Sequence, residues 1–188
     1  MKQKKKPSIG HNKKTFLKNP VEHIDIKSFD ARRIIDSMGK MSFTSRDTAN
    51  AAKIYNEMLT DKDCAIFLTI AGSTSAAGCM NLYSDLIKYN MVDAIVATGA
   101  SIIDMDFFEA LGFKHYQGSQ FQDDTVLRAN YIDRIYDTYI NEDELQACDK
   151  IIFDIANTLE HRSYTSREFI KEIGKYLKKN AKKKKFIN

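Results

Sequence analysis

Two short turns rich in small residues carry the residue types that could hold an anionic ligand. The first lies within TIAGSTSAAG, residues 69–78, and the second within TGASIID, residues 98–104. Small residues allow a ligand to approach the backbone closely, and the free N–H groups at the start of a helix attract phosphate. Asp104, just behind the second turn, is placed to accept hydrogen bonds from ribose hydroxyls. The pattern therefore indicates a nucleotide-type cofactor site.

A second interpretation of these turns stays open at this point. Neither turn spells GxGxxG, although AGSTSAAG offers Gly72 and Gly78. Asp104 also lies nearer its turn than the spacing of about 20 residues in the usual dinucleotide motif. On this alternative, the small residues only permit close helix–strand packing, and Asp104 stabilises the N-terminus of its helix.

Other side chains with reactive groups give weaker signals. We interpret His115 as a structural residue and Asp123-Asp124 as part of a solvated loop, with no further metal ligand spaced around them. None of the serines lies in a GxSxG elbow, which argues against acyl transfer. The three cysteines are widely spaced and form no CxxC pair, so the sequence predicts no metal site and no disulfide framework.

The two turns must be positioned by the elements around them. Residues 64–72 form a uniformly apolar run, and residues 91–98 form a second, mostly apolar run. Both predict strands buried on both faces, as in a parallel sheet. Residues 73–90 and 102–113 predict a helix after each strand, the second stopped by Gly112. This alternation predicts an α/β fold with a parallel sheet flanked by helices.

The flanking segments are mostly helical in pattern. Residues 30–61 predict helix, divided at Gly39, and residues 133–140 predict one short strand. Asn141 is expected to cap the helix that follows. Thr165 or Ser166, with Glu168, forms a capping signature before another helix.

Composition places the chain among globular proteins of one domain. It has 188 residues, 43% of them hydrophobic, and a net charge of +4. We expect a mobile basic tail over residues 1–18, a folded part over 19–177 and a Lys-rich tail over 178–188. No run approaches the ~18 apolar residues of a membrane span, no secretory signal is recognisable, and no aromatic residues interleave with the first Lys run. We therefore expect a cytoplasmic protein without membrane or nucleic-acid partners.

Three segments carry a family resemblance: DKDCAIFLTIAGSTSAAG, LIKYNMVDAIVATGASIIDMDFFEALGFKHYQGS and IDRIYDTYINEDELQACD. They resemble deoxyhypusine synthase, and most closely its bacterial deoxyhypusine synthase-like branch, over residues 19–177. NMVDAIVATGA is the most specific element. The resemblance implies a Rossmann-like fold that binds NAD. It also implies transfer of the aminobutyl group of spermidine, through an imine on an active-site lysine, to an acceptor amine. That acceptor would be a lysine of the hypusine-bearing translation factor or a polyamine.

The resemblance also implies a set of NAD-contacting positions. The first turn departs from the family's Thr-Ser-Asn, so some of the cofactor binding there would have to come from backbone N–H groups. The implied positions are Ala71, Gly72, Ser73 and Ala76 in the first turn, and Thr98, Gly99, Ala100 and Asp104 in the second.

The match ends near residues 176–177, whereas family members continue through further strands and the imine-forming lysine. We therefore expect an apparently truncated N-terminal half with no catalytic residue and no turnover on its own. Expected partners are copies of itself, as in the family's tetramer, or a full-length homologue. A non-catalytic partner subunit and a decayed, inactive product are the alternatives.

Overall fold

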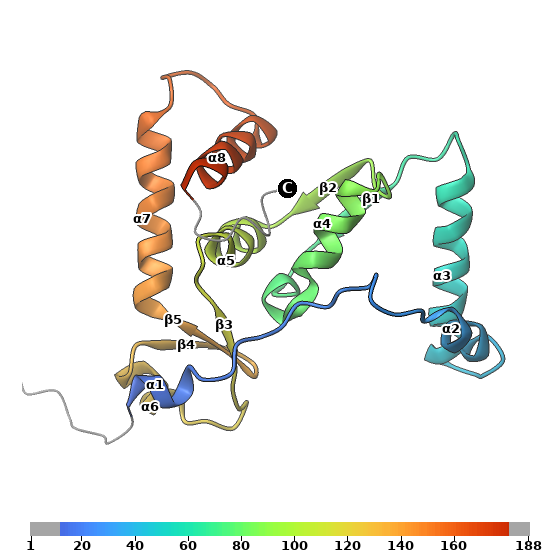
Figure 1. Ribbon diagram of the computed structural model, residues 1–188, viewed down its shortest axis with the longest axis horizontal. Coiled ribbons are helices and arrows are strands. Elements are labelled where there is room, and N and C mark those ends of the chain that lie inside the picture. Colours follow the sequence, from blue (N-terminus) through green and yellow to red (C-terminus); the bar gives the residue numbers. More distant parts are fainter. Residues whose placement is uncertain (1–11, 181–188) are drawn as a thin grey trace, which may run out of the picture.

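The two predicted strands pair in parallel near the centre of the molecule. The structure, a computed structural model, describes residues 12–180. In this part of the chain β1 (Phe67–Ile70) lies beside β2 (Ala94–Ala97), in register from the first residue of each strand to the last (Figure 1). Both strands therefore end at the same edge of the sheet, and the predicted parallel pair is confirmed.

Helices follow both strands, as the sequence pattern predicts. After β1 the chain forms a π-helical turn, η1 (Ser75–Cys79), which leads into α4 (Met80–Lys88). After β2 it forms η2 (Ser101–Phe107) and the short α5 (Phe108–Ala110). Gly112 follows with a φ of 102°, a left-handed conformation that ends the helix at little steric cost.

The strands are less buried than their apolar sequences predict. Phe67 is 66% exposed and Val96 is 58% exposed. Among the described residues no third strand pairs with β1 or β2. The prediction of burial on both faces is therefore wrong. An apolar run shows that a strand prefers burial, but the covering layers must come from other elements.

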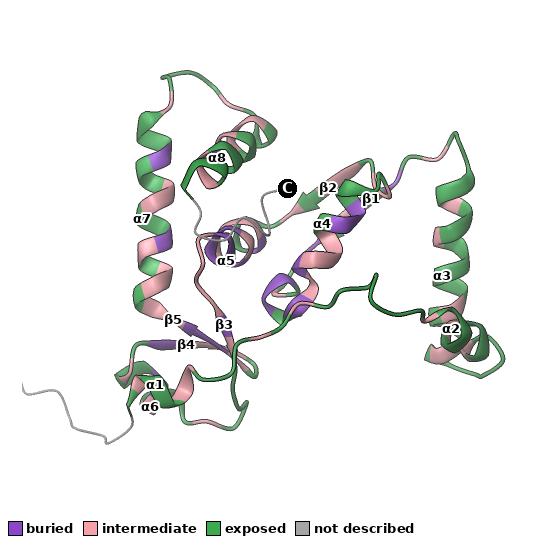
Figure 2. Cartoon of the chain, viewed as in Figure 1, coloured by how far each residue is buried: buried purple, intermediate pink, exposed green. Residues whose placement is uncertain are grey.

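A helical hairpin stands beside this centre, at the right of Figure 1. It comprises α2 (Arg32–Met38) and α3 (Thr44–Thr60), with Gly39 ending α2 as predicted. Neither helix contains a buried residue, and Figure 2 shows the hairpin as largely exposed. The Tyr55 hydroxyl of α3 donates a hydrogen bond to the Met91 carbonyl oxygen at 2.7 Å, which ties the hairpin to the segment before β2.

A second, antiparallel sheet was not predicted. Its order is β3 (His115–Gln117), β5 (Thr138–Asn141), β4 (Ile132–Ile135). The single strand predicted over residues 133–140 is wrong, because the chain reverses at Tyr136, which has a φ of 56°. These strands are short and mix polar with apolar residues, so their pattern resembles that of a loop.

Two long helices complete the core. They are α7 (Glu142–Thr158) and α8 (Ser166–Asn180). Both predicted caps are confirmed: Asn141 Oδ1 accepts from the Asp143 N–H at 3.2 Å, and Glu168 Oε2 accepts from the Thr165 N–H at 2.8 Å. The helices bury a cluster that also includes α5 and β5, made of Phe107, Phe108, Ile140, Cys148, Ile155 and Ile173.

The ends of the chain are described only in part. Residues 1–11 and 181–188, which hold most of the two predicted basic tails, lie outside the described residues. Within the first predicted tail, α1 (Lys13–Phe16) is helical, and Phe16 packs against the buried Tyr139 and Leu127, the latter from α6 (Asp124–Ala129). The architecture is thus mixed α/β with one parallel strand pair, and a wider Rossmann-like sheet stays a prediction.

Candidate cofactor-binding site

One buried hydroxyl joins the two glycine turns at the carboxyl ends of β1 and β2. Ser101 Oγ donates to the carbonyl oxygen of Gly72 at 3.1 Å and lies 3.0 Å from Thr98 Oγ1. The Ser101 N–H also donates to Thr98 Oγ1, at 3.3 Å. Ser101 is only 1% exposed, so water does not compete for these bonds. The spacing between the turns is therefore set by the side chain of Ser101.

Both turns present open backbone to solvent. A Cβ added at Gly72 or Gly99 would meet no heavy atom within 4 Å, and both residues are exposed. Gly72 has a φ of 75°, which favours glycine at that position. The first N–H groups of a helix lack partners within the helix. The surface above the two glycines therefore fits an anionic group such as a pyrophosphate.

The predicted site residues fall into two groups by exposure. Ala71, Thr98 and Ala100 are exposed and Ser73 is half-buried, so they border the open surface together with the two glycines. Ala76 lies inside η1 and is 1% exposed. Its side chain packs within the protein and does not line this surface.

Asp104 occupies the first turn of η2. Burial and the nearby carboxylate of Asp149, on α7, raise the pKa of Asp104. On the same side, Cys148 donates its S–H to the Ile103 carbonyl oxygen at 3.5 Å. Burial, Asp149 and Asp104 raise the pKa of this thiol to about 12, so Cys148 is an unreactive core residue. Because the charge of Asp104 lies close to that of Asp149, a hydrogen-bond donor that approaches Asp104 would stabilise its ionised form.

Two histidines share the buried carboxylate of Glu109, on α5. Glu109 Oε2 lies 2.6 Å from His23 Nε2, and Glu109 Oε1 lies 2.6 Å from His115 Nδ1. Glu109 is 6% exposed and His115 is 1% exposed. Burial alone would raise the pKa of Glu109, but the hydrogen bonds from His115 and His23 outweigh it and hold the pKa at about 2.

This cluster fastens the N-terminal arm, residues 19–30, across both strand–helix units. The Val21 N–H donates to the His115 carbonyl oxygen at 2.8 Å, and the Ile24 N–H donates to the Gly78 carbonyl oxygen at 2.9 Å. Since Gly78 belongs to η1 and Glu109 to α5, the arm holds the helix of the first turn against the helix of the second. The prediction that His115 is structural is consistent with this geometry.

Sequence reasoning missed both the cluster and the role of Ser101. The only local signal for Ser101 is the Thr98-x-x-Ser101 spacing, typical of a hydroxyl that bonds the first turn of a helix. No local signal connects His23 to Glu109, because 86 residues separate them.

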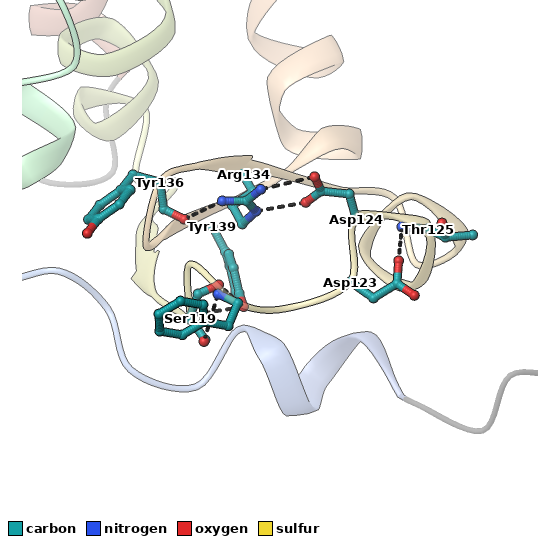
Figure 3. Close-up of polar contacts among 8 residues, drawn as sticks. Ser119, Asp123, Asp124, Thr125, Arg134, Tyr136 and Tyr139 are labelled. Carbon is teal, nitrogen blue, oxygen red and sulfur yellow. Dashed lines mark hydrogen bonds and ion pairs between the residues drawn. The ribbon is translucent and has the colours of Figure 1, made fainter.

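The neighbouring acids Asp123 and Asp124 have structural partners (Figure 3). Asp123 Oδ1 accepts from the Thr125 N–H at 2.7 Å and caps α6. Asp124 binds Arg134 through two hydrogen bonds of 2.7 and 3.0 Å, and this pairing lowers the pKa of Asp124. Across residues 12–180, no group of three or more His, Cys, Asp or Glu residues is arranged to hold a metal ion.

None of the helices formed by residues 12–180 combines the length and the apolar character that a transmembrane helix needs.

Comparison with known proteins relates this geometry to a family. The sequence model of the deoxyhypusine synthase family matches residues 33–186. Two deoxyhypusine synthase-like proteins, from Coxiella burnetii and Caulobacter vibrioides, are each 64% identical over 94% of this chain. A probable deoxyhypusine synthase 2 from Methanosarcina acetivorans is 36% identical over 90% of it. The matched segments cover 50%, 48% and 48% of these relatives, so the chain spans about half their length. The chain belongs to the deoxyhypusine synthase family.

Proposed function

We propose that this chain supplies the NAD-binding part of a deoxyhypusine synthase-like transferase of the cytoplasm. The observation that carries the proposal is the joining of the two open glycine turns through Ser101 at the carboxyl ends of a parallel strand pair. Ligands of α/β proteins bind at this edge of the sheet. Family membership supports NAD as the ligand.

Each residue of the site would have one task. Backbone N–H groups at Gly72, Ser73, Gly99 and Ala100 would hold the pyrophosphate, since the start of a helix favours negative charge. Asp104 would accept hydrogen bonds from ribose hydroxyls, which would offset its repulsion from Asp149. When bound, NAD would accept a hydride from spermidine and later return it.

The overall reaction would move the aminobutyl group of spermidine to an acceptor amine, either a protein lysine or a polyamine. By the family resemblance, the imine-forming lysine would lie in the half of the relatives that the matched segment does not cover. Turnover would therefore need that half as well. The first turn would bind more weakly than in relatives with side-chain donors there, because Ala71 and Gly72 can offer only backbone groups.

A second candidate function is that of a non-catalytic subunit bound to a full-length homologue. Its specific support is that the chain spans about half the length of its relatives. In such a complex the homologue would supply the complete active site. Catalytic activity of the complex would then be unaffected by changes at Asp104 of this chain.

Calorimetric titration with NAD tests the proposal. We expect saturable binding that Asp104→Ala weakens by about tenfold or more, because a charge-assisted hydrogen bond contributes roughly 1.5–3 kcal/mol. Asp154→Ala is the matched control, since Asp154 is an exposed acid in the middle of α7 and should leave the affinity unchanged. Equal affinity of the Asp104→Ala variant and the parent chain would overturn the assignment of Asp104. The assignment of the site would be overturned if folded protein bound no NAD, both alone and together with the half of a relative that lies outside the matched segment.

A further inference from the structure

The first glycine turn carries one hydroxyl group that faces solvent. Within residues 71–76, three positions hold alanine or glycine and have no polar side chain. Ser73 is half-buried and Ser75 is only 1% exposed, whereas Thr74 is exposed. Thr74 is therefore the hydroxyl of this turn that a ligand arriving from solution reaches most directly.

The oxygen of this hydroxyl already has a donor. The Tyr83 hydroxyl, on α4, donates to Thr74 Oγ1 at 2.7 Å. Thr74 directly precedes η1, a position at which a threonine oxygen commonly accepts from an N–H of its own helix. Thr74 makes no such capping bond. The bond from Tyr83 therefore fixes the direction of the Thr74 side chain.

The hydrogen of the Thr74 hydroxyl remains available to a ligand. A hydroxyl has one O–H donor and two acceptor lone pairs, and the bond from Tyr83 uses only a lone pair. Within residues 12–180 the structure gives the Thr74 O–H no acceptor. A hydroxyl that accepts one hydrogen bond is polarised and becomes a stronger donor in another. The Thr74 O–H is thus suited to an anionic oxygen.

The threonine of the second turn differs in this respect. Ser101 Oγ gives its hydrogen to the Gly72 carbonyl oxygen, so in the 3.0 Å contact between Ser101 and Thr98 the Thr98 hydroxyl is the donor. Thr98 Oγ1 also accepts from the Ser101 N–H. The O–H of Thr98 is therefore committed within the protein, while that of Thr74 is not.

Tyr83 lies at the edge of the sheet where both strands end. It borders a cavity of about 320 Å³ together with Ser101 and with Ile70 and Ala97, the last residues of β1 and β2. Since Ser101 joins the two turns, Tyr83 and its partner Thr74 lie at the same edge as the turns. The Thr74 hydroxyl can therefore act together with the backbone N–H groups there.

We propose that the Thr74 hydroxyl donates a hydrogen bond to a phosphate oxygen of the bound dinucleotide, and that Tyr83 is the positioning residue that orients it. This inference rests on the proposed function, because it adds a side-chain donor to the same NAD site. It offsets part of the loss at Ala71 and Gly72, which can offer only backbone groups.

Calorimetric titration with NAD tests the proposal on the full chain, both alone and together with the half of a relative that lies outside the matched segment. We expect Thr74→Val, which replaces the hydroxyl by a methyl group, to weaken NAD binding by about tenfold. Thr74→Ser keeps the hydroxyl and should bind NAD like the parent. Thr48→Val is the matched control, since the exposed Thr48 hydroxyl donates to the Thr44 carbonyl oxygen within α3, and it should leave the affinity unchanged.

Phosphorus NMR at saturating NAD distinguishes a phosphate contact from a structural effect. The pyrophosphate signals of bound NAD should differ between the parent and Thr74→Val. They should coincide between the parent and Asp104→Ala, because Asp104 is assigned to the ribose hydroxyls.

A double-mutant cycle tests the role of Tyr83. Tyr83→Phe keeps the ring but removes the donor to Thr74, so it should weaken NAD binding by about threefold. In the Thr74→Val background the same change should have no further effect, because Tyr83 acts only through the Thr74 hydroxyl. Equal effects of Tyr83→Phe in both backgrounds would overturn its positioning role.

The outcomes separate this inference from the proposed function. If the parent binds NAD and Thr74→Val binds it equally well, or with unchanged phosphorus signals, the contact from Thr74 is overturned and the NAD site stands. If the folded parent binds no NAD in either setting, the proposed function fails and this inference fails with it.

Discussion

Replacing Glu109 by Gln should destabilise the protein more than most single changes of a surface acid. The substitution keeps the shape of the side chain but removes the charge that both imidazoles bind. A Gln oxygen can accept from one imidazole only, and its NH₂ group then faces the N–H of the other. The pKa of Glu109 falls from its ordinary value of 4.5 to about 2 in the folded protein. At 1.36 kcal/mol per pKa unit, this corresponds to about 3 kcal/mol of stability.

The sign of the pH dependence follows from the lowered pKa. A carboxyl group with a lowered pKa contributes its full stabilisation above 4.5, the unfolded value, and loses it as the pH falls through about 2. The half-buried Asp106 also faces this cluster, and desolvation raises its pKa, but Asp106 is present in both proteins. We therefore expect the difference between parent and Glu109→Gln to be about 3 kcal/mol at pH 7 and smaller by about 2 kcal/mol at pH 3.

Urea unfolding followed by circular dichroism at the two pH values measures this difference. Glu57→Gln is the control, because the Glu57 side chain is 64% exposed and lies 3.9 Å from Lys53 on the surface of α3. It should cost less than about 0.5 kcal/mol. A Glu109→Gln protein within about 0.5 kcal/mol of the parent at pH 7 would refute the reasoning that the two histidines stabilise a buried charge.

Three further substitutions test two glycine positions and the environment of Asp104 in the second turn. Gly78→Ala should destabilise by about 1–3 kcal/mol, because Gly78 has a φ of 102° and a Cβ there would lie 2.8 Å from the Glu22 carbonyl oxygen. Gly174→Ala, a helical position with nothing within 4 Å, should instead stabilise by about 0.5–1 kcal/mol, and thermal unfolding of both variants gives the signs. Asp104→Asn should weaken NAD binding yet raise stability slightly, since it removes repulsion from Asp149. A loss of stability would support the alternative in which Asp104 only stabilises its helix.

The strand–turn–helix units could be predicted because their signals are local. Each apolar run ends in small residues, and the second helix ends at a glycine in the left-handed conformation. The covering of the strands could not be predicted in the same way. Phe67 and Val96 have the residue types of a buried strand and are exposed, because burial depends on partners that the run itself does not contain.

Most of the features that the sequence pattern did not predict depend on contacts between segments far apart in the chain. Ser101 bonds the Gly72 carbonyl oxygen across 29 residues, so its part in joining the turns follows only from the folded structure. The contact between His23 and Glu109, across 86 residues, likewise follows only from the folded structure. The hairpin of β4 and β5 was missed for another reason: Tyr136 adopts a positive φ without the glycine or asparagine that usually marks such a turn.

Mapping by NMR decides whether the two glycine turns together form the NAD site. The isotope-labelled full chain is titrated with NAD, both alone and together with the half of a relative that lies outside the matched segment. The backbone amide signals of residues 71–76 and 98–104 should shift together. The Asp104→Ala variant should reduce these shifts, and Asp154→Ala should not. Shifts confined to other parts of a folded chain, or none at saturating NAD in either setting, would show that the two turns are not the NAD site.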